Sequence, residues 1–155
     1  MRPRTAPLVD GALRTLRVQY VTQACVGEGI GTHTIEATEI ALAAPFADAL
    51  QPNARIASNL SAAIAFVLDT ADLPFTVETV CRVHAIVGTG VVPNPGEFRT
   101  HPACPVGSPL MYKNPRRIAA SLRELVDVTA DAAAAATTTE DAVKNAARFM
   151  SSFLV

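Results

Sequence analysis

The sequence predicts an all-α domain that carries one small β-hairpin, and three observations lead to this fold class. Half of the 155 residues are hydrophobic and only 17% are charged, so the chain has enough apolar side chains to form a core. Tryptophan is absent and aromatic residues make up 5%, which favours closely packed helices lined by Ala, Val, Leu and Ile. Apolar residues recur at helical spacing except between Val91 and Pro115, where six of the eleven prolines lie.

Charge, hydropathy and cysteine content exclude several classes of protein. The net charge of -1 predicts no electrostatic attraction to nucleic acid or to an anionic membrane. No run approaches the roughly 18 apolar residues of a membrane span, and charged residues interrupt the region where a signal peptide would lie. Cys25, Cys81 and Cys104 are far apart and lack CxxC spacing, so neither a disulfide framework nor a structural zinc site is expected. We therefore expect a cytoplasmic protein with no nucleic-acid or membrane partner.

The first predicted helix carries an apolar stripe formed by Leu13, Leu16, Tyr20 and Ala24, and it ends before a glycine-rich run at residues 27–31. This run is predicted to be a hinge. Residues 1–29 are accordingly expected to form an N-terminal helix and hinge, and residues 30–155 a second segment. A phosphate cradle is the alternative, but the second half of a GxGxxG pattern and a preceding strand are both missing.

Three helices are predicted next. A short one spans residues 32–44 and stops at Pro45. A second begins at Ala54, with its apolar face formed by Ile56, Leu60, Ala63, Ile64 and Val67. A third is capped by Thr76 and closed by Gly88, with a buried side formed by Val77, Val80, Cys81, His84 and Val87. A lone histidine on such a face is more typical of a hydrogen-bonded core residue than of a metal ligand.

The proline-rich region is expected to form the hairpin, through pairing of residues 98–104 with residues 106–112 in a ladder that the prolines restrict. Asn114 and Pro115 then cap and begin an amphipathic helix, whose apolar face is Ile118, Leu122, Leu125 and Val128. The alanine run at residues 132–136 and the threonines at 137–139 are predicted to be a solvated connector. Thr139 opens the last helix, whose predicted stripe is Ala142, Val143, Ala146, Ala147, Met150, Phe153 and Leu154.

Three sequence segments, taken in order, carry a family resemblance. Residues 32–37, Thr-His-Thr-Ile-Glu-Ala, are similar to an inhibitory motif (S/T)xxxE(G/N), with Ala37 at the last position. Val83-His84 and the later Gly-Glu-Phe-Arg-Thr of residues 96–100 are similar to an IH…GxFRT pattern that leads into a flap hairpin. Residues 114–126 and 141–155 are similar to the two helices that follow the flap. The order and spacing of these segments, from residue 32 to residue 155, resemble the Fic (Fido) family of AMP-transferring proteins, whose helical fold would be incomplete here.

The resemblance implies a protein adenylyltransferase, which moves AMP from ATP to a protein hydroxyl and uses Mg²⁺. It implies that Glu36 is an inhibitory carboxylate, which pairs with a phosphate-binding arginine, and that Thr32 holds the inhibitory helix in place. The alternative for Glu36 is a solvated surface residue. An extended segment of the target protein would bind to the flap by strand addition, at Arg99, Thr100 and His101. The nucleotide would lie near Val106, Gly107, Ser108 and Pro109, unless this segment is simply a rigid proline loop.

The family's signature HPFx(D/E)GNGR, which supplies the histidine base, the phosphate-binding loop and the metal-binding acid, does not occur in the sequence. We expect the chain to stop just before it. His101 and Asp127 are the nearest substitutes, but both positions are more typical of surface residues. This chain alone is therefore expected to be inactive and to bind neither ATP nor Mg²⁺ tightly, with a homodimer left open. The alternative function is a catalytically inactive, small helical module that binds another protein.

Overall fold

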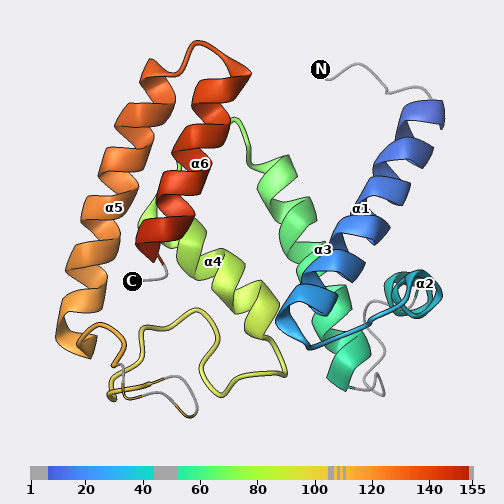
Figure 1. Cartoon of the computed structure of the whole chain (residues 1–155), viewed down its shortest axis with the longest axis horizontal. Helices are drawn as coiled ribbons and strands as arrows, with labels where there is room; N and C mark the ends of the chain where they lie inside the picture. Colours follow the sequence, from blue (N-terminus) through green and yellow to red (C-terminus); the bar gives the residue numbers. More distant parts are fainter. Residues whose placement is uncertain (1–6, 44–51, 105–106, 108, 110, 154–155) are drawn as a thin grey trace. The chain divides into compact units, whose positions relative to one another are not determined.

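A computed structural model describes residues 7–43, 52–104, 107, 109 and 111–153 of the chain (Figure 1). Within these residues the chain forms six α-helices and no β-strand, which confirms the all-α class. The helices are α1 (Pro7–Glu28), α2 (Ile35–Ala43), α3 (Pro52–Asp69), α4 (Val77–Gly88), α5 (Pro115–Ala135) and α6 (Thr139–Phe153). In the described part of the chain, none of the helices combines the length and apolar character needed to cross a bilayer.

The chain divides into two compact units. The first comprises Met1–Thr70 and Val83–Pro95, and the second comprises Ala71–Arg82 and Gly96–Val155. The division falls within α4, whose first residues belong to the second unit and whose last residues belong to the first. The boundary predicted at residues 29 and 30 lies inside the first unit.

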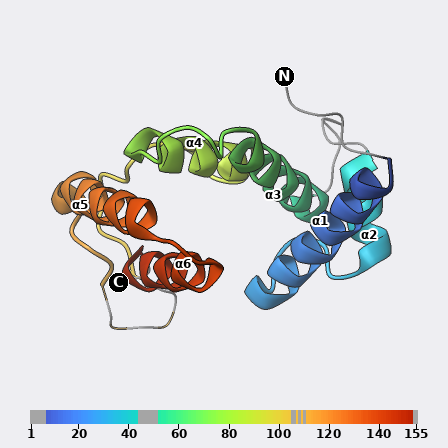
Figure 2. The same ribbon diagram turned by 90° about the horizontal axis from the view of Figure 1, so that it is seen from above.

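The first unit is built on α1, α2 and α3, which pack against one another in all three pairs. Figure 2 shows α2 lying across α1. The core where these helices meet consists of small side chains, with larger ones of α3 packed around it: Val21, Cys25, Ala41 and Ala57, flanked by Ala54, Ile56, Leu60 and Ile64. Small side chains at the centre allow the three helix axes to approach closely.

The glycine-rich run at the end of α1, predicted to be a hinge, forms a hydrogen-bonded helix cap. The amide of Gly29 donates to the carbonyl of Val26 at 3.2 Å, and the amide of Ile30 donates to that of Cys25 at 3.1 Å. This pair of bonds is the Schellman motif, and Gly29 adopts the positive φ of 67° that the motif requires. Gly31 follows with a φ of 79°, and a Cβ there would lie 2.5 Å from the buried Cys25 Sγ.

The apolar stripe predicted for α1 lies on the wrong face of the helix. Leu16 and Tyr20 are 60% and 62% exposed, while the buried side carries Val18, Val21, Thr22 and Cys25. The helix has apolar residues on two faces, and helical periodicity does not identify which one meets α2 and α3. The face with the smaller side chains is buried because it permits the closer packing.

The end of α4 is attached to α3 by one amide side chain. Asn59 Nδ2 donates to the carbonyls of Val87 and Thr89, at 3.0 and 2.8 Å. These carbonyls lie at the helix C-terminus, where no further turn supplies a donor. Gly88 closes α4 as predicted, but His84 is exposed, so its placement in a core was wrong.

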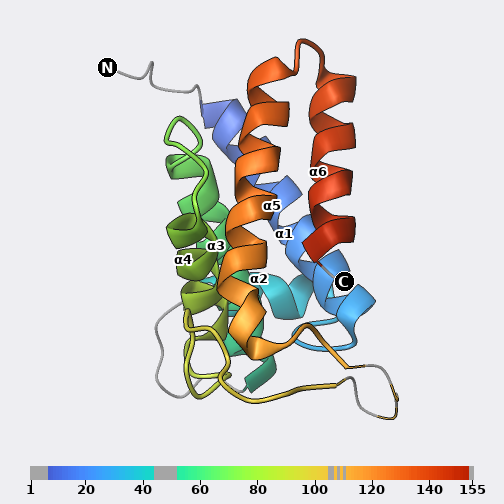
Figure 3. The same ribbon diagram turned by 90° about the vertical axis from the view of Figure 1, so that its left-hand side faces the viewer.

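The second unit contains α5 and α6, which run antiparallel and side by side (Figure 3). Leu122 and Val126 are the buried residues of α5. As predicted, Asn114 caps this helix, with its side-chain oxygen accepting from the amide of Arg116 at 3.0 Å, and Pro115 begins it.

Helix α5 continues through most of the alanine run, which is therefore not a connector. Alanine has the highest helix propensity, and Asn145 Nδ2 donates to the carbonyl of Ala132 at 2.9 Å, so the run also has a partner.

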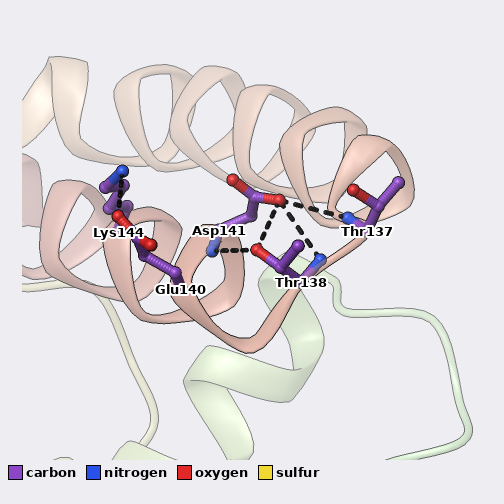
Figure 4. Close-up of polar contacts among 5 residues, drawn as sticks. All are labelled: Thr137, Thr138, Glu140, Asp141 and Lys144. Carbon is purple, nitrogen blue, oxygen red and sulfur yellow. Dashed lines mark hydrogen bonds and ion pairs between the residues drawn. The ribbon is translucent and has the colours of Figure 1, made fainter.

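Helix α6 begins with a capping box centred on Thr138 (Figure 4). The Thr138 hydroxyl accepts from the amide of Asp141 at 3.1 Å and donates to Asp141 Oδ2 at 2.8 Å. Oδ2 also accepts from the amides of Thr138 and Thr137, at 3.2 and 3.4 Å. The cap is therefore one residue earlier than the predicted Thr139, and the ion pair of Glu140 with Lys144 at 2.6 Å supports the first turn.

The predicted stripe of α6 is also on the wrong face. Val143 and Met150 are exposed, whereas Asp141, Asn145 and Phe149, which recur every four residues, form the half-buried side. Leu154 lies outside the described residues.

The predicted hairpin is not seen among the described residues of the proline-rich segment. Residues 98–104, 107, 109, 111 and 112 contain no strand, and one backbone bond, from the amide of Tyr112 to the carbonyl of Ala103 at 2.9 Å, joins the two sides. Pro102 and Pro109 have no amide to donate, so a regular ladder loses donors on each side.

Candidate functional site

The residues predicted to be inhibitory lie where α2 begins, in the first unit. Thr34 caps the helix, because its hydroxyl accepts from the amide of Ala37 at 3.1 Å. Glu36 follows in the first turn, where the positive end of the helix dipole favours a carboxylate. Its side chain is exposed. The carboxylate is thus at the surface of the first unit, on a helix whose start is fixed.

Thr32 is buried just before this helix. Its hydroxyl lies 2.7 Å from the hydroxyl of Thr38, which lies 2.8 Å from that of Thr22 on α1. The Thr38 hydroxyl also contacts the carbonyl of Thr34 at 2.9 Å, and that of Thr22 contacts the carbonyl of Val18 at 2.9 Å. We call Thr22, Thr32 and Thr38 the threonine cluster. It joins Thr32, just before α2, and Thr38 of α2 to Thr22 of α1.

The sequence reasoning missed Thr22 and Thr38. A signal for both was present, since Thr22 lies four residues after Val18 and three before Cys25, and Thr38 lies three before Ala41. All three of these apolar residues are buried. A threonine in phase with buried residues on a helix is expected to find a hydroxyl or carbonyl partner in the core.

The predicted flap residues lie in the second unit. The guanidinium of Arg99 donates to the carbonyl of His101 at 2.8 Å and to the carbonyl of Lys113, so it closes a loop of residues 99–113 at its base. Thr100 and His101 are exposed on this loop. The positive charge of Arg99 is directed at the loop's own carbonyls.

The residues predicted to lie near the nucleotide are described only in part. Val106 and Ser108 lie outside the described residues. Gly107 has a φ of 75° with open space around its Cα, and Pro109 is exposed. The structure thus brings Thr32 together with its two threonine partners and Arg99 with His101. The threonine cluster and the loop belong to different units.

Metal ligands do not gather in the described part of the chain, where no three His, Cys, Asp or Glu side chains come together.

An apolar groove of about 500 Å³ lies in the first unit. Leu13, Leu16 and Tyr20 of α1 form one wall, and residues of α3 and the end of α4 form the rest: Leu60, Ala63, Ile64, Val67, Leu68, Val83 and Val87. Arg17 is the charged residue of the lining. The stripe predicted to enter the core of α1 therefore lines this groove.

Comparisons with protein families, with curated proteins and with solved structures found no match for this chain, so its function is argued from its own residues.

Proposed function

We propose that this chain is the N-terminal portion of a Fic-type protein adenylyltransferase, which transfers AMP from ATP to a hydroxyl of a target protein. The observation that carries the proposal is the arrangement at the start of α2. Thr32 is buried and hydrogen-bonded, and Glu36, one turn later, is exposed. An inhibitory motif requires a helix that is held firmly and a carboxylate that remains available, and these two residues meet both requirements.

Inhibition would act through the charge of Glu36. An exposed carboxylate in the first turn of α2 can pair with an arginine of the phosphate-binding signature, which then no longer holds the γ-phosphate of ATP. Hydrogen bonds to charged groups are worth about 1.5 to 3 kcal/mol. Thr32 contributes by keeping the start of α2 against α1.

The loop closed by Arg99 would bind the target. Because Arg99 holds the two ends of this segment together, less conformational entropy would be lost when a target segment binds. Thr100 and His101 are exposed where such a segment would approach. ATP and Mg²⁺ would be held mainly by the signature.

The first test is the nucleotide sequence that follows the Val155 codon. An HPFx(D/E)GNGR string within a few residues, in any reading frame, supports the proposal. Stop codons in all three frames, with no such string before them, contradict it.

The second test measures transfer of labelled AMP from ATP. The 155-residue chain should give no label above a no-protein control. In the protein extended through the signature, Glu36→Gly should raise transfer roughly ten- to a hundredfold, because the paired arginine is freed for ATP. Glu39→Gly is the matched control, since Glu39 is also exposed on α2. Equal effects of the two substitutions, or no gain from Glu36→Gly, contradict the inhibitory role.

The apolar groove favours a second function, the binding of another protein. Its lining is apolar apart from Arg17, so the occupant with the best chemistry is an amphipathic helix that carries a carboxylate beside its apolar face. The test uses two fluorescent helical peptides with the same leucine face, one flanked by glutamates and one by lysines. The glutamate peptide should bind more tightly, Arg17→Gln should abolish the difference, and Leu16→Gln should weaken both. Equal binding of the two peptides contradicts this function.

A further inference from the structure

The threonine cluster is the main polar connection between α1 and α2. Thr22, Thr32 and Thr38 are 4%, 6% and 0% exposed, so no water competes for their hydroxyls. Thr38 is central, because its hydroxyl contacts Thr22, Thr32 and the carbonyl of Thr34. Each of the other two threonines contacts only one other member of the cluster.

The cluster has more contacts than protons. Three hydroxyls carry three protons, while the contacts of the cluster number four: Thr22 with the carbonyl of Val18, Thr22 with Thr38, Thr38 with Thr32, and Thr38 with the carbonyl of Thr34. One proton must therefore be shared between two acceptors. Removal of the Thr38 hydroxyl ends three of the four contacts at once, whereas removal of the Thr32 hydroxyl ends one.

Helix α2 also packs against α3, with Ala41 in the shared core, but its printed polar side-chain contact with α1 runs through the threonine cluster. Thr38 and Ala41 are its buried residues, and Ala41 offers only a methyl group. Glu36 lies two residues before Thr38, about 200° around the helix axis, so the two side chains leave nearly opposite sides of the helix. When Thr38 is bonded inward, the rotation of α2 is fixed and Glu36 is directed outward.

We infer that Thr38 is a positioning residue that sets the direction of Glu36, and that the threonine cluster therefore determines whether α2 inhibits. This inference rests on the proposed function, in which Glu36 is the inhibitory carboxylate. Thr38 touches no substrate and acts through the rotation of the helix.

The first experiment uses the 155-residue chain and does not depend on the proposed function. Hydrogen exchange of the α2 amides is followed by mass spectrometry in Thr38→Val, which keeps the shape but not the hydroxyl, and in Thr38→Ser, which keeps the hydroxyl. Thr38→Val should speed exchange in α2 on the order of tenfold, and Thr38→Ser should stay near the original rate. Thr129→Val is the matched control, because Thr129 makes a single bond to the carbonyl of Leu125 on α5. Thr32→Val, which ends one contact, provides a milder variant if Thr38→Val does not fold.

The second experiment measures AMP transfer in the protein extended through the signature. Thr38→Val should raise transfer as Glu36→Gly does and should add nothing in a Glu36→Gly background. Thr38→Ser, which keeps the hydroxyl, should leave transfer near the level of the original protein. If Glu36→Gly raises transfer and Thr38→Val does not, the inference is wrong and the proposed function stands. If transfer is absent, or Glu36→Gly leaves it unchanged, the proposed function fails and the inference fails with it. Unchanged α2 exchange in Thr38→Val overturns the inference in either case.

Discussion

The rings of Phe75 and Phe149 meet edge to face, with their centroids 5.4 Å apart and their planes at 79°. Phe149 lies on the half-buried side of α6, and Phe75 lies in the segment just before α4, so the pair joins two parts of the second unit that are distant in sequence. An edge-to-face pair is stabilised by the ring quadrupoles as well as by burial.

This pair should show a measurable coupling energy. In a double-mutant cycle of Phe75→Leu and Phe149→Leu, urea unfolding should give a coupling of about 0.5 to 1.5 kcal/mol, which is the typical worth of an aromatic pair beyond its buried area. Met150→Leu, at an exposed position on the same helix, is the control and should change stability little. Additive effects of the two phenylalanine substitutions would show that the rings contribute only by burial.

The glycines at the end of α1 and just after it should differ sharply in how far their replacement by alanine lowers stability. Gly31→Ala should lower the free energy of unfolding in two ways. The positive φ should cost about 1 to 2 kcal/mol, and the clash with the buried Cys25 about 1 to 3 kcal/mol more. Gly29→Ala meets only the cost of the positive φ, because nothing lies within 4 Å of its Cβ position. Gly27→Ala should be neutral or slightly stabilising, since Gly27 is helical and unobstructed. Thermal unfolding of the three variants checks this order, and a tolerated Gly31→Ala would contradict the packing of Cys25.

The stability of the fold should depend on both the size and the charge of the side chain at position 59. Asn59→Ala removes two donors from the carbonyls at the end of α4 and should lower the free energy of unfolding by about 1 to 3 kcal/mol. Asn59→Asp should be more harmful, because a carboxylate would face two carbonyl oxygens. Guanidinium unfolding measures both, with Asn53→Ala, at an exposed position on the same helix, as the control. If aspartate is tolerated better than alanine, the amide is not donating to these carbonyls.

The capping box of α6 should weaken in acid. The hydrogen bond from the Thr138 hydroxyl, followed by that from the amide of Thr137, lowers the pKa of Asp141 below the ordinary value of an aspartate. A carboxyl whose pKa is lower in the folded state stabilises the fold above the unfolded pKa, and this contribution is lost as the pH falls through the folded pKa. Stability should therefore drop as the pH goes below about 4, and Asp141→Asn should make that drop shallower.

Thermal unfolding between pH 6 and pH 2 measures this dependence, with Asp131→Asn as an exposed control on α5. The pKa of Glu78 is also lowered, mainly by its own backbone amide and by the hydroxyl of Thr76, so some acid sensitivity should remain in Asp141→Asn. An identical pH profile for Asp141→Asn and the original chain would contradict the role of the carboxylate.

The sequence predicts where helices form far better than it predicts which face each one buries. Asn114 and Pro115 carry their own start signal, and the cap depends on atoms only two residues apart, so this boundary is predictable. The buried face of α1 depends instead on α2 and α3, whose small residues admit Val21 and Cys25 and leave Tyr20 exposed. Local spacing cannot encode that choice when a helix has two apolar faces.

In the candidate site too, features set by local sequence could be predicted, and features set by contacts between helices could not. The apolar spacing and Pro45 predict a short helix at residues 32–44 with Glu36 near its start, and the structure has this helix at Ile35–Ala43. The spacing of Thr22 and Thr38 indicates that both are buried, but their contact could not be predicted, because Thr22 lies on α1 and reaches Thr38 only when the two helices cross. The predicted hairpin is not seen among the described residues, and the physical reason is that its prolines favour an extended chain but lack the amides that a ladder needs.

The three cysteines differ in accessibility, so their labelling rates can report how often α1, α2 and α3 separate. Cys104 is exposed, Cys81 is half-buried, and Cys25 is 2% exposed beneath Gly31. A thiol-reactive dye will therefore label Cys104 at once, whereas Cys25 reacts only during moments when α1, α2 and α3 separate. The labelling rate of Cys25 in plain buffer then gives the frequency of those separations, with Cys104 as the internal standard for the reactivity of an accessible thiol.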